Sequence, residues 1–121
     1  MKKLKFIVTG TGRCGTVFAA RYLTSIGIKC VHECFFNRDG LKEAKFRLKH
    51  PEHISTSIVS GNSWLYDSID IIAESSYMAA PFLNENLLNE AKVIHIIRNP
   101  IEVVSSFVTA FNYFNNPAEL T

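Results

Sequence analysis

The sequence predicts an α/β fold in three layers, with a parallel sheet flanked by helices. Short apolar segments alternate along the chain with segments whose apolar residues recur at helical spacing. This alternation is typical of a parallel sheet that helices cover through right-handed crossovers. The chain has 121 residues, of which 47% are hydrophobic, and this suits one domain with its own core.

The first half of the chain supplies two predicted strands and two predicted helices. Residues 4–9 are a short apolar run that ends at a glycine, as a buried parallel strand does. Residues 16–26 have apolar positions at helical spacing, and Gly27 is expected to end that helix. Residues 28–32 predict a second strand, and the charged, amphipathic segment 38–50 predicts a second helix.

The second half repeats the alternation. Residues 69–73 predict a third strand, which ends at the polar sequence that begins with Glu74. Residues 81–90 predict a helix with a proline near its start. Residues 92–97, "KVIHII", predict the fourth strand, and residues 100–114 predict a last helix with a proline in its first turn.

Composition excludes several classes of protein. The net charge of +2 is too small to indicate a nucleic-acid partner, although it is compatible with a small anion held by a few cations. No segment approaches the roughly 18 apolar residues of a membrane span, so none is expected. The apolar run near the N-terminus is too short for a signal peptide. Three cysteines without disulfide spacing favour a reducing compartment, and we expect a cytoplasmic protein.

Residues 10–17, "GTGRCGTV", have nearly the form of a phosphate-binding loop, G-x-x-x-x-G-K-[ST]. A glycine turn between a strand and a helix lets the backbone approach an anion, and the first N–H groups of the helix point at it. Thr16 and Val17 stand where the lysine and the magnesium-binding hydroxyl belong. The loop therefore predicts a P-loop nucleotide-hydrolase-like fold with an anion site, and not Mg-ATP hydrolysis. A glycine turn that serves only compactness is the alternative.

Arg13 returns one cation inside this loop. A guanidinium can bind a phosphate or a sulfonate through paired hydrogen bonds. A second group follows the fourth predicted strand, where Arg98 precedes Asn99-Pro100 and Ser106 lies about two turns into the last helix. Ligands of open α/β sheets bind at this edge, so Arg98 and Ser106 can converge on one anion. The alternative is a surface arginine beside an incidental serine.

In combination, the two motifs resemble the sulfotransferases that use 3′-phosphoadenosine 5′-phosphosulfate (PAPS). In that family a loop [KR]-x-G-[ST]-[ST] binds the 5′-phosphosulfate, and residues 13–17 match it except for Val17. A later arginine, followed by [ND]-P and by a serine eight residues on, binds the 3′-phosphate. The resemblance covers residues 4–110 and implies PAPS as donor, adenosine 3′,5′-bisphosphate as product and no required metal. The nucleotide-binding residues it implies are Gly12, Arg13, Cys14, Gly15, Thr16, Val17, Arg98 and Ser106.

Sulfonate transfer needs a base for the acceptor proton and a cation for the leaving oxygen. Glu33 follows the second predicted strand and is the first candidate for the base, with His32 the second. Glutamates in a similar place are the bases of tyrosylprotein and trehalose sulfotransferases, which the segment resembles. The same resemblance makes Arg13 the electrophilic partner at the sulfonate. The alternative is that Glu33 is a solvated loop carboxylate.

The same segment also raises the question of a metal. Cys30, His32 and Cys34 alternate and would share one face of a strand. Such an extended row diverges and does not close around one ion, and zinc sites have other spacings. We therefore expect no metal site and two buried cysteines.

The acceptor is expected to be a small molecule, a sugar or a lipid that offers a hydroxyl or amine, and a protein tyrosine stays open. The segment Glu74-Ser75-Ser76-Tyr77 follows the third predicted strand at the same sheet edge and is expected to line the acceptor pocket, with core packing as the alternative. The chain ends soon after the second motif, whereas the family usually continues. We therefore expect one domain over residues 1–121 that lacks the usual C-terminal part, and a homo-oligomer is a further expectation. Two alternatives stay open, a P-loop-type kinase of nucleotides or phosphate compounds and a non-catalytic nucleotide-binding remnant.

Overall fold

The computed structural model describes residues 2–11, 15–52, 54, 61–65, 70–84, 88 and 90–111. Its elements follow the predicted order. They are β1 (Phe6–Gly10), α1 (Thr16–Ser25), β2 (Cys30–His32), α2 (Gly40–Lys49), β3 (Ala73–Ser75), the 3₁₀ helix η2 (Tyr77–Phe82), β4 (Lys92–Ile96) and α4 (Pro100–Phe111).

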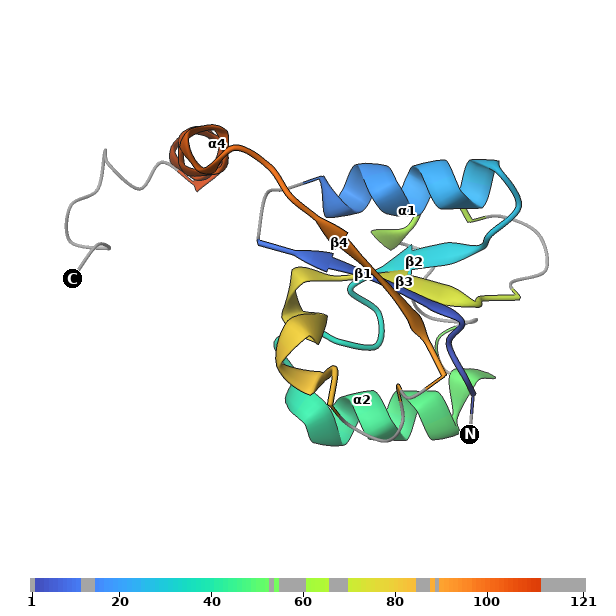
Figure 1. Ribbon diagram of the computed structural model, residues 1–121. Helices are drawn as coiled ribbons and strands as arrows, with labels where there is room; N and C mark the ends of the chain where they lie inside the picture. The colour runs from blue at the N-terminus through green and yellow to red at the C-terminus, as the bar shows by residue number, and fades with distance from the viewer. Residues whose placement is uncertain are drawn as a thin grey trace.

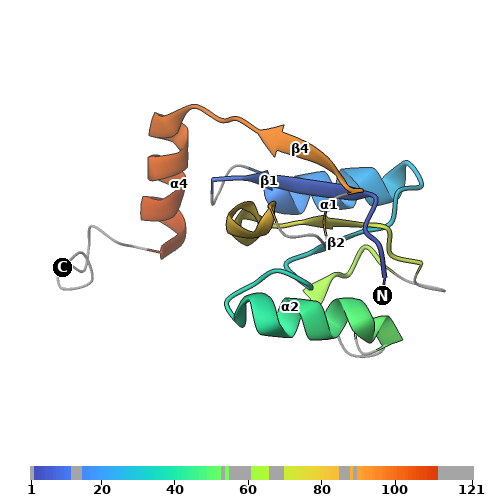
Figure 2. The ribbon, with the colours of Figure 1, turned by 60° about the horizontal axis from the view of Figure 1, so that its bottom comes forward.

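The four strands form one parallel sheet in the order β2-β3-β1-β4. Helix α1 covers one face of this sheet, and α2 with η2 covers the other (Figure 1). The prediction of an α/β fold with a parallel sheet between helices is confirmed. Because all strands run the same way, their carboxyl ends meet at one edge, and α4 lies beyond that edge (Figures 1 and 2).

Two clusters of buried side chains hold the layers together. The larger cluster joins the sheet to α2 and includes Phe35, Phe36, Leu48 and Ile54, each almost inaccessible to solvent. The smaller cluster lies under α1 and consists of Ala20, Cys30 and Ala73, with larger, partly buried residues around it. The loop after β2 contributes its two phenylalanines to the larger cluster, so the core itself fixes this loop.

Local signals placed the ends of several elements correctly. Helix α1 ends at Ser25, and Gly27 follows with φ +97°, a left-handed conformation that glycine adopts at little cost. Helix α4 begins at Pro100, as predicted. Residues 112–114 of the predicted last helix lie outside the described residues.

The predicted third strand is placed wrongly. The strand β3 comprises Ala73–Ser75, where Phe6 of β1 pairs with Ala73, and not residues 69–73. Residues 71 and 72 approach the sheet without joining it as strand, and Ile69 is outside the described residues. The polar Glu74 does not end the strand, because three backbone N–H groups satisfy its buried carboxyl group.

The predicted helix at residues 81–90 is also wrong in its described part. The helical segment there is η2, which starts earlier, at Tyr77, and contains Pro81 within it. The Ser76 side chain accepts a hydrogen bond from the Met78 N–H at 3.1 Å and so begins the turn directly after β3. Residues 85–87 and 89 lie outside the described part of the chain.

Strand β4 and helix α4 are the least covered elements. Four of the five β4 residues are exposed, and Ile97 and Ile101 beyond the strand are 85% and 78% exposed. Val103 is the buried residue among the described α4 side chains. The expected homo-oligomer stays a prediction. No helix in the described ranges has both the length and the apolar character needed to cross a membrane.

Candidate functional site

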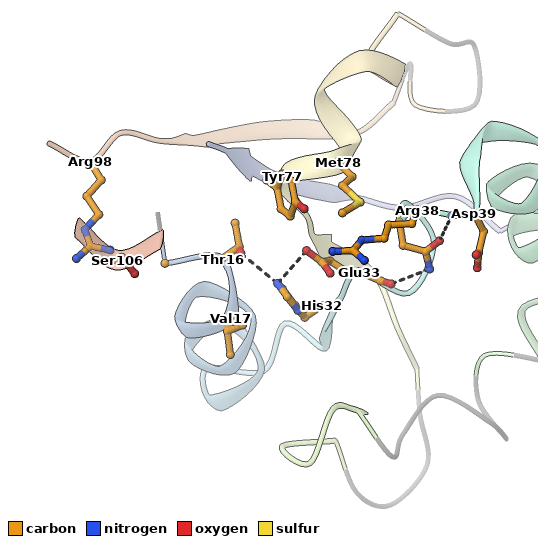
Figure 3. Close-up of a pocket in the computed structure, with 12 residues that line it drawn as sticks. Thr16, Val17, His32, Glu33, Arg38, Asp39, Tyr77, Met78, Arg98 and Ser106 are labelled. Carbon is orange, nitrogen blue, oxygen red and sulfur yellow. Dashed lines mark hydrogen bonds and ion pairs between the residues drawn. The ribbon is translucent and has the colours of Figure 1, made fainter. Parts of the chain in front are cut away.

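A pocket of about 680 Å³ opens at the carboxyl edge of the sheet (Figure 3). It draws its walls from the start of α1, the end of β2 and the loop after it, η2, and α4 with the residues before it. The lining residues are Gly15, Thr16, Val17, His32, Glu33, Asn37, Arg38, Asp39, Tyr77, Met78, Arg98 and Ser106. Volumes of this size are typical of sites for small molecules and nucleotides.

The first part of the pocket is the N-terminal end of α1. Gly15 precedes the helix with φ +101°, a backbone conformation that favours glycine. Thr16 and Val17 begin the helix, and the N–H groups of its first turn have no acceptors within the helix. This end therefore favours an anion. The predicted ligands Gly12, Arg13 and Cys14 lie outside the described residues.

Glu33 and His32 lie in the middle of the pocket, next to Thr16 (Figure 3). His32 Nε2 is 3.1 Å from Thr16 Oγ1 and 3.7 Å from Glu33 Oε1. Glu33 has φ +53°, an uncommon conformation for a residue with a side chain. Strained backbone of this kind is concentrated at functional sites, so the observation favours a role for Glu33 over a solvated loop carboxylate.

His32 is held from both sides. Its backbone N–H donates to Asn62 Oδ1 at 2.7 Å, and its ring is hydrogen-bonded to Thr16. Burial disfavours the charged imidazole and lowers its pKa, and the charge of Glu33 opposes this only in part. The imidazole therefore lies between the Thr16 hydroxyl and the Glu33 carboxylate.

Arg98 and Ser106 lie at one end of the pocket (Figure 3). Arg98 leaves β4 at its carboxyl end, and its Nε is 3.6 Å from Glu102 Oε2 on α4. The Asn99 side chain accepts from the Ile101 N–H at 2.8 Å and so fixes the start of α4. The two residues predicted to share an anion line the same pocket as Glu33.

Glu74 supports the loop that carries Glu33. The carboxyl group accepts hydrogen bonds from the N–H groups of Cys34, Phe35 and Phe36, at 2.6 Å from Cys34 and 2.7 Å from Phe36. The residue is fully buried, and burial raises the pKa of its carboxyl group to about 8 against the opposing effect of the three N–H donors. The buried Glu74 carboxyl group on β3 thus fixes the three consecutive residues that follow Glu33.

The two serines that follow Glu74 complete this support. Ser75 Oγ donates to Thr16 O at 2.6 Å, and Ser76 Oγ donates to Phe36 O at 2.8 Å. Both serines are fully buried. The sequence Glu74-Ser75-Ser76 therefore ties the start of α1 and the loop after β2 to the same strand.

Sequence reasoning missed four residues of the pocket. Asn37, Arg38 and Asp39 follow Glu33 in one loop, and Met78 lies on η2 beside the expected Tyr77. Their signal was available, since residues that follow a strand at the carboxyl edge tend to line a site. Of the segment expected to line the acceptor pocket, Tyr77 does so, whereas Glu74, Ser75 and Ser76 are fully buried and support the site from within the protein.

Of the three alternating residues, His32 lines the pocket, whereas Cys30 in β2 and Cys34 in the loop after it pack in the core. Cys30 and Cys34 are buried thiols, and burial raises the pKa of Cys30 to about 12 and also raises that of Cys34. Over the described residues, no group of three histidine, cysteine or acidic side chains is arranged to hold a metal ion.

Comparison of the chain with models of protein families, with curated proteins and with solved structures finds no match.

Proposed function

We propose that this chain is a sulfotransferase that moves a sulfonate group from PAPS to a hydroxyl or amine acceptor. One observation carries the proposal. Arg98 and Ser106, from the last strand exit and helix, line the same pocket as the start of α1 and Glu33. The pocket thus offers one anion site at Arg98 and Ser106 and another at the start of α1, where the candidate base Glu33 lies. This arrangement matches a donor with a phosphate group at each end.

The described residues suit such a donor. Arg98 and Ser106 supply a guanidinium and a hydroxyl for the 3′-phosphate at one end of the pocket. The N–H groups at the start of α1 and the Thr16 hydroxyl suit the 5′-phosphosulfate. Arg13 is assigned to the same group by the motif. The donor supplies the sulfonate, and the chain binds and orients it.

Glu33 is the proposed base. It takes the proton of the acceptor hydroxyl, whose oxygen forms the new bond to sulfur. The bond between sulfur and the bridging oxygen breaks, and its electron pair stays on the departing 5′-phosphate. His32 Nε2 lies 3.7 Å from Glu33 Oε1 and 3.1 Å from Thr16 Oγ1, so the imidazole stands between the base and the helix start. The charge that develops on the leaving oxygen is stabilised by the α1 N–H groups and Arg13.

The finer fold assignment belongs to this proposal. We infer a P-loop-like fold from a loop between the first strand and the first helix at the carboxyl edge of a parallel sheet. Thr16 and Val17 replace the lysine and hydroxyl residue of the ATP-binding loop. This replacement is the reason to prefer a sulfonate donor over Mg-ATP. We place the protein in the cytoplasm, because the buried Cys30 and Cys34 are thiols.

The test is transfer of radiolabelled sulfonate from PAPS to a panel of hydroxyl compounds, by the wild type and by Glu33→Gln. The amide cannot accept the proton, so we expect kcat to fall by about 10²–10⁴-fold while bisphosphate binding is retained. Glu43→Gln, an exposed carboxylate in the first turn of α2, is the matched control and should act as wild type. Unchanged transfer by Glu33→Gln would remove Glu33 from the mechanism.

A further inference from the structure

The pocket has a second end that the nucleotide does not explain. Arg98 and Ser106 mark one end, and Glu33 lies between them and a group formed by Arg38 and Met78, with Tyr77 above Glu33 in this view (Figure 3). If the donor extends from Arg98 to the start of α1, this group faces the acceptor. The inference therefore rests on the proposed sulfonate transfer.

Most polar and charged side chains at this end already interact with other groups of the protein. Asp39 Oδ2 is 2.6 Å from Arg47 Nη2, which neutralises the aspartate. The Asn37 side chain accepts from Arg47 at 3.2 Å and donates to Glu33 O at 3.1 Å. It also accepts from the Asp39 N–H at 2.9 Å, so its hydrogen-bonding capacity is largely used.

Arg38 differs from its neighbours. No ion pair joins Arg38 to any residue in the described ranges, although its side chain lines the pocket. In Figure 3 the guanidinium reaches back toward Glu33 and Tyr77, and not away from the cavity. A guanidinium in this position is a recognition group for an anion, through paired hydrogen bonds.

We propose that Arg38 selects an acceptor that carries an anionic group, a carboxylate or a sulfate ester, close to the hydroxyl that is sulfonated. Tyr77 and Met78 supply the aromatic and thioether surface on which the body of such a compound lies. An acidic sugar has this combination of a hydroxyl, a nearby anion and an apolar ring face. A neutral lipid alcohol has no group for Arg38.

The experiment measures transfer of labelled sulfonate to three matched compounds, methyl glucoside, methyl glucuronide and methyl glucoside 6-sulfate. The variants are Arg38→Gln, Arg38→Lys and, as a control, Arg21→Gln on the exposed side of α1. We expect kcat/KM to be about tenfold higher or more for the two anionic compounds, the size of one charge-assisted hydrogen bond. Arg38→Gln should abolish this preference, Arg38→Lys should keep part of it, and Arg21→Gln should leave it unchanged.

Bisphosphate binding is measured on every variant, so that the two proposals fail separately. Equal use of neutral and charged compounds, or a preference that survives in Arg38→Gln, would overturn the role of Arg38. Binding of the bisphosphate without transfer to any of the three compounds would overturn the acceptor class. Failure to bind the bisphosphate would instead count against sulfonate transfer itself. A preference for one anionic compound over the other tells a carboxylate site from a sulfate site.

Discussion

At Glu74, burial and hydrogen bonding act on one carboxyl group in opposite directions. Three backbone N–H donors favour the carboxylate, whereas complete burial disfavours its charge. Among the described residues, no lysine, arginine or histidine forms an ion pair with it. Burial is therefore the larger effect, and the pKa rises from its ordinary 4.5 to about 8.

This shift makes stability depend on pH. Between pH 4.5 and about 8 the folded protein keeps a proton at Glu74 that the unfolded chain has lost. The stabilisation is complete below 4.5 and is lost as the pH rises through the folded value. We expect this residue to lower the free energy of unfolding by up to about 1.4 kcal/mol per pH unit across that window.

Glu74→Gln isolates the effect, because the amide does not titrate. Its NH₂ group would face a backbone N–H, so the variant should be less stable at low pH by about 1–3 kcal/mol. The difference from the wild type should shrink as the pH rises toward 8. Urea unfolding of both proteins at several pH values measures it. Two parallel stability curves would show that Glu74 does not titrate in this window.

At the scale of the elements, two glycines test which turn belongs to the site. Gly15 has φ +101° before α1, and Gly27 has φ +97° after it. A Cβ at either position would meet no atom within 4 Å, so an alanine costs only backbone strain, about 1–2 kcal/mol. Thermal unfolding should therefore detect a similar loss of stability in Gly15→Ala and Gly27→Ala.

The two variants should differ in ligand binding. Gly15 lines the pocket, where a methyl group would occupy the space of an anion close to the backbone. We expect Gly15→Ala to weaken bisphosphate binding by about tenfold, or about 1.4 kcal/mol, and Gly27→Ala to bind as wild type. Equal affinities in calorimetry would mean that the start of α1 does not hold the ligand.

The elements also show how far the sequence determines the fold. Strands β1 and β4 and helix α1 were predictable because each has a local signal, an apolar run or a glycine at the end. The strand β3 was misplaced because the N–H groups that satisfy Glu74 come from a loop 38 to 40 residues away in the sequence. No local pattern reveals such partners. The helix η2 was missed for a related reason, since Ser76 caps it only once β3 is in place.

The candidate site was predictable to the same extent. Thr16 begins α1, Glu33 and Arg98 follow strands, and Ser106 lies within the helix after β4, while the carboxyl ends of parallel strands meet at one edge. Their placement in one pocket follows from topology. The position of Arg38 depends on the path of a loop, which the buried Phe35 and Phe36 fix, and no spacing in the sequence predicts this.

At the scale of the whole molecule, α4 is the pocket wall with the least described packing against the rest of the protein. It provides Ser106 to the site, and Val103 is the buried side chain among those described on it. Val103→Ala should loosen α4 and weaken bisphosphate binding by about threefold to tenfold. The melting temperature should change little, because elements with few buried contacts open separately from the core.

The neighbouring Val104 supplies the control. It is 54% exposed on the same helix, so Val104→Ala should leave both affinity and melting temperature unchanged. Hydrogen exchange of the α4 amides gives a third readout and should be faster in Val103→Ala than in Val104→Ala. A large fall in the melting temperature of Val103→Ala would instead make α4 part of the cooperative core.

The most direct measurement is calorimetric titration of the chain with adenosine 3′,5′-bisphosphate, without metal. Mg-ATP serves as the comparison ligand, and Arg98→Ala is measured alongside. Micromolar binding of the bisphosphate, lost by tenfold or more in Arg98→Ala and not matched by Mg-ATP, is the predicted result, about the effect of one charged contact. A preference for Mg-ATP, or bisphosphate binding that Arg98→Ala leaves intact, would contradict the proposed sulfotransferase site.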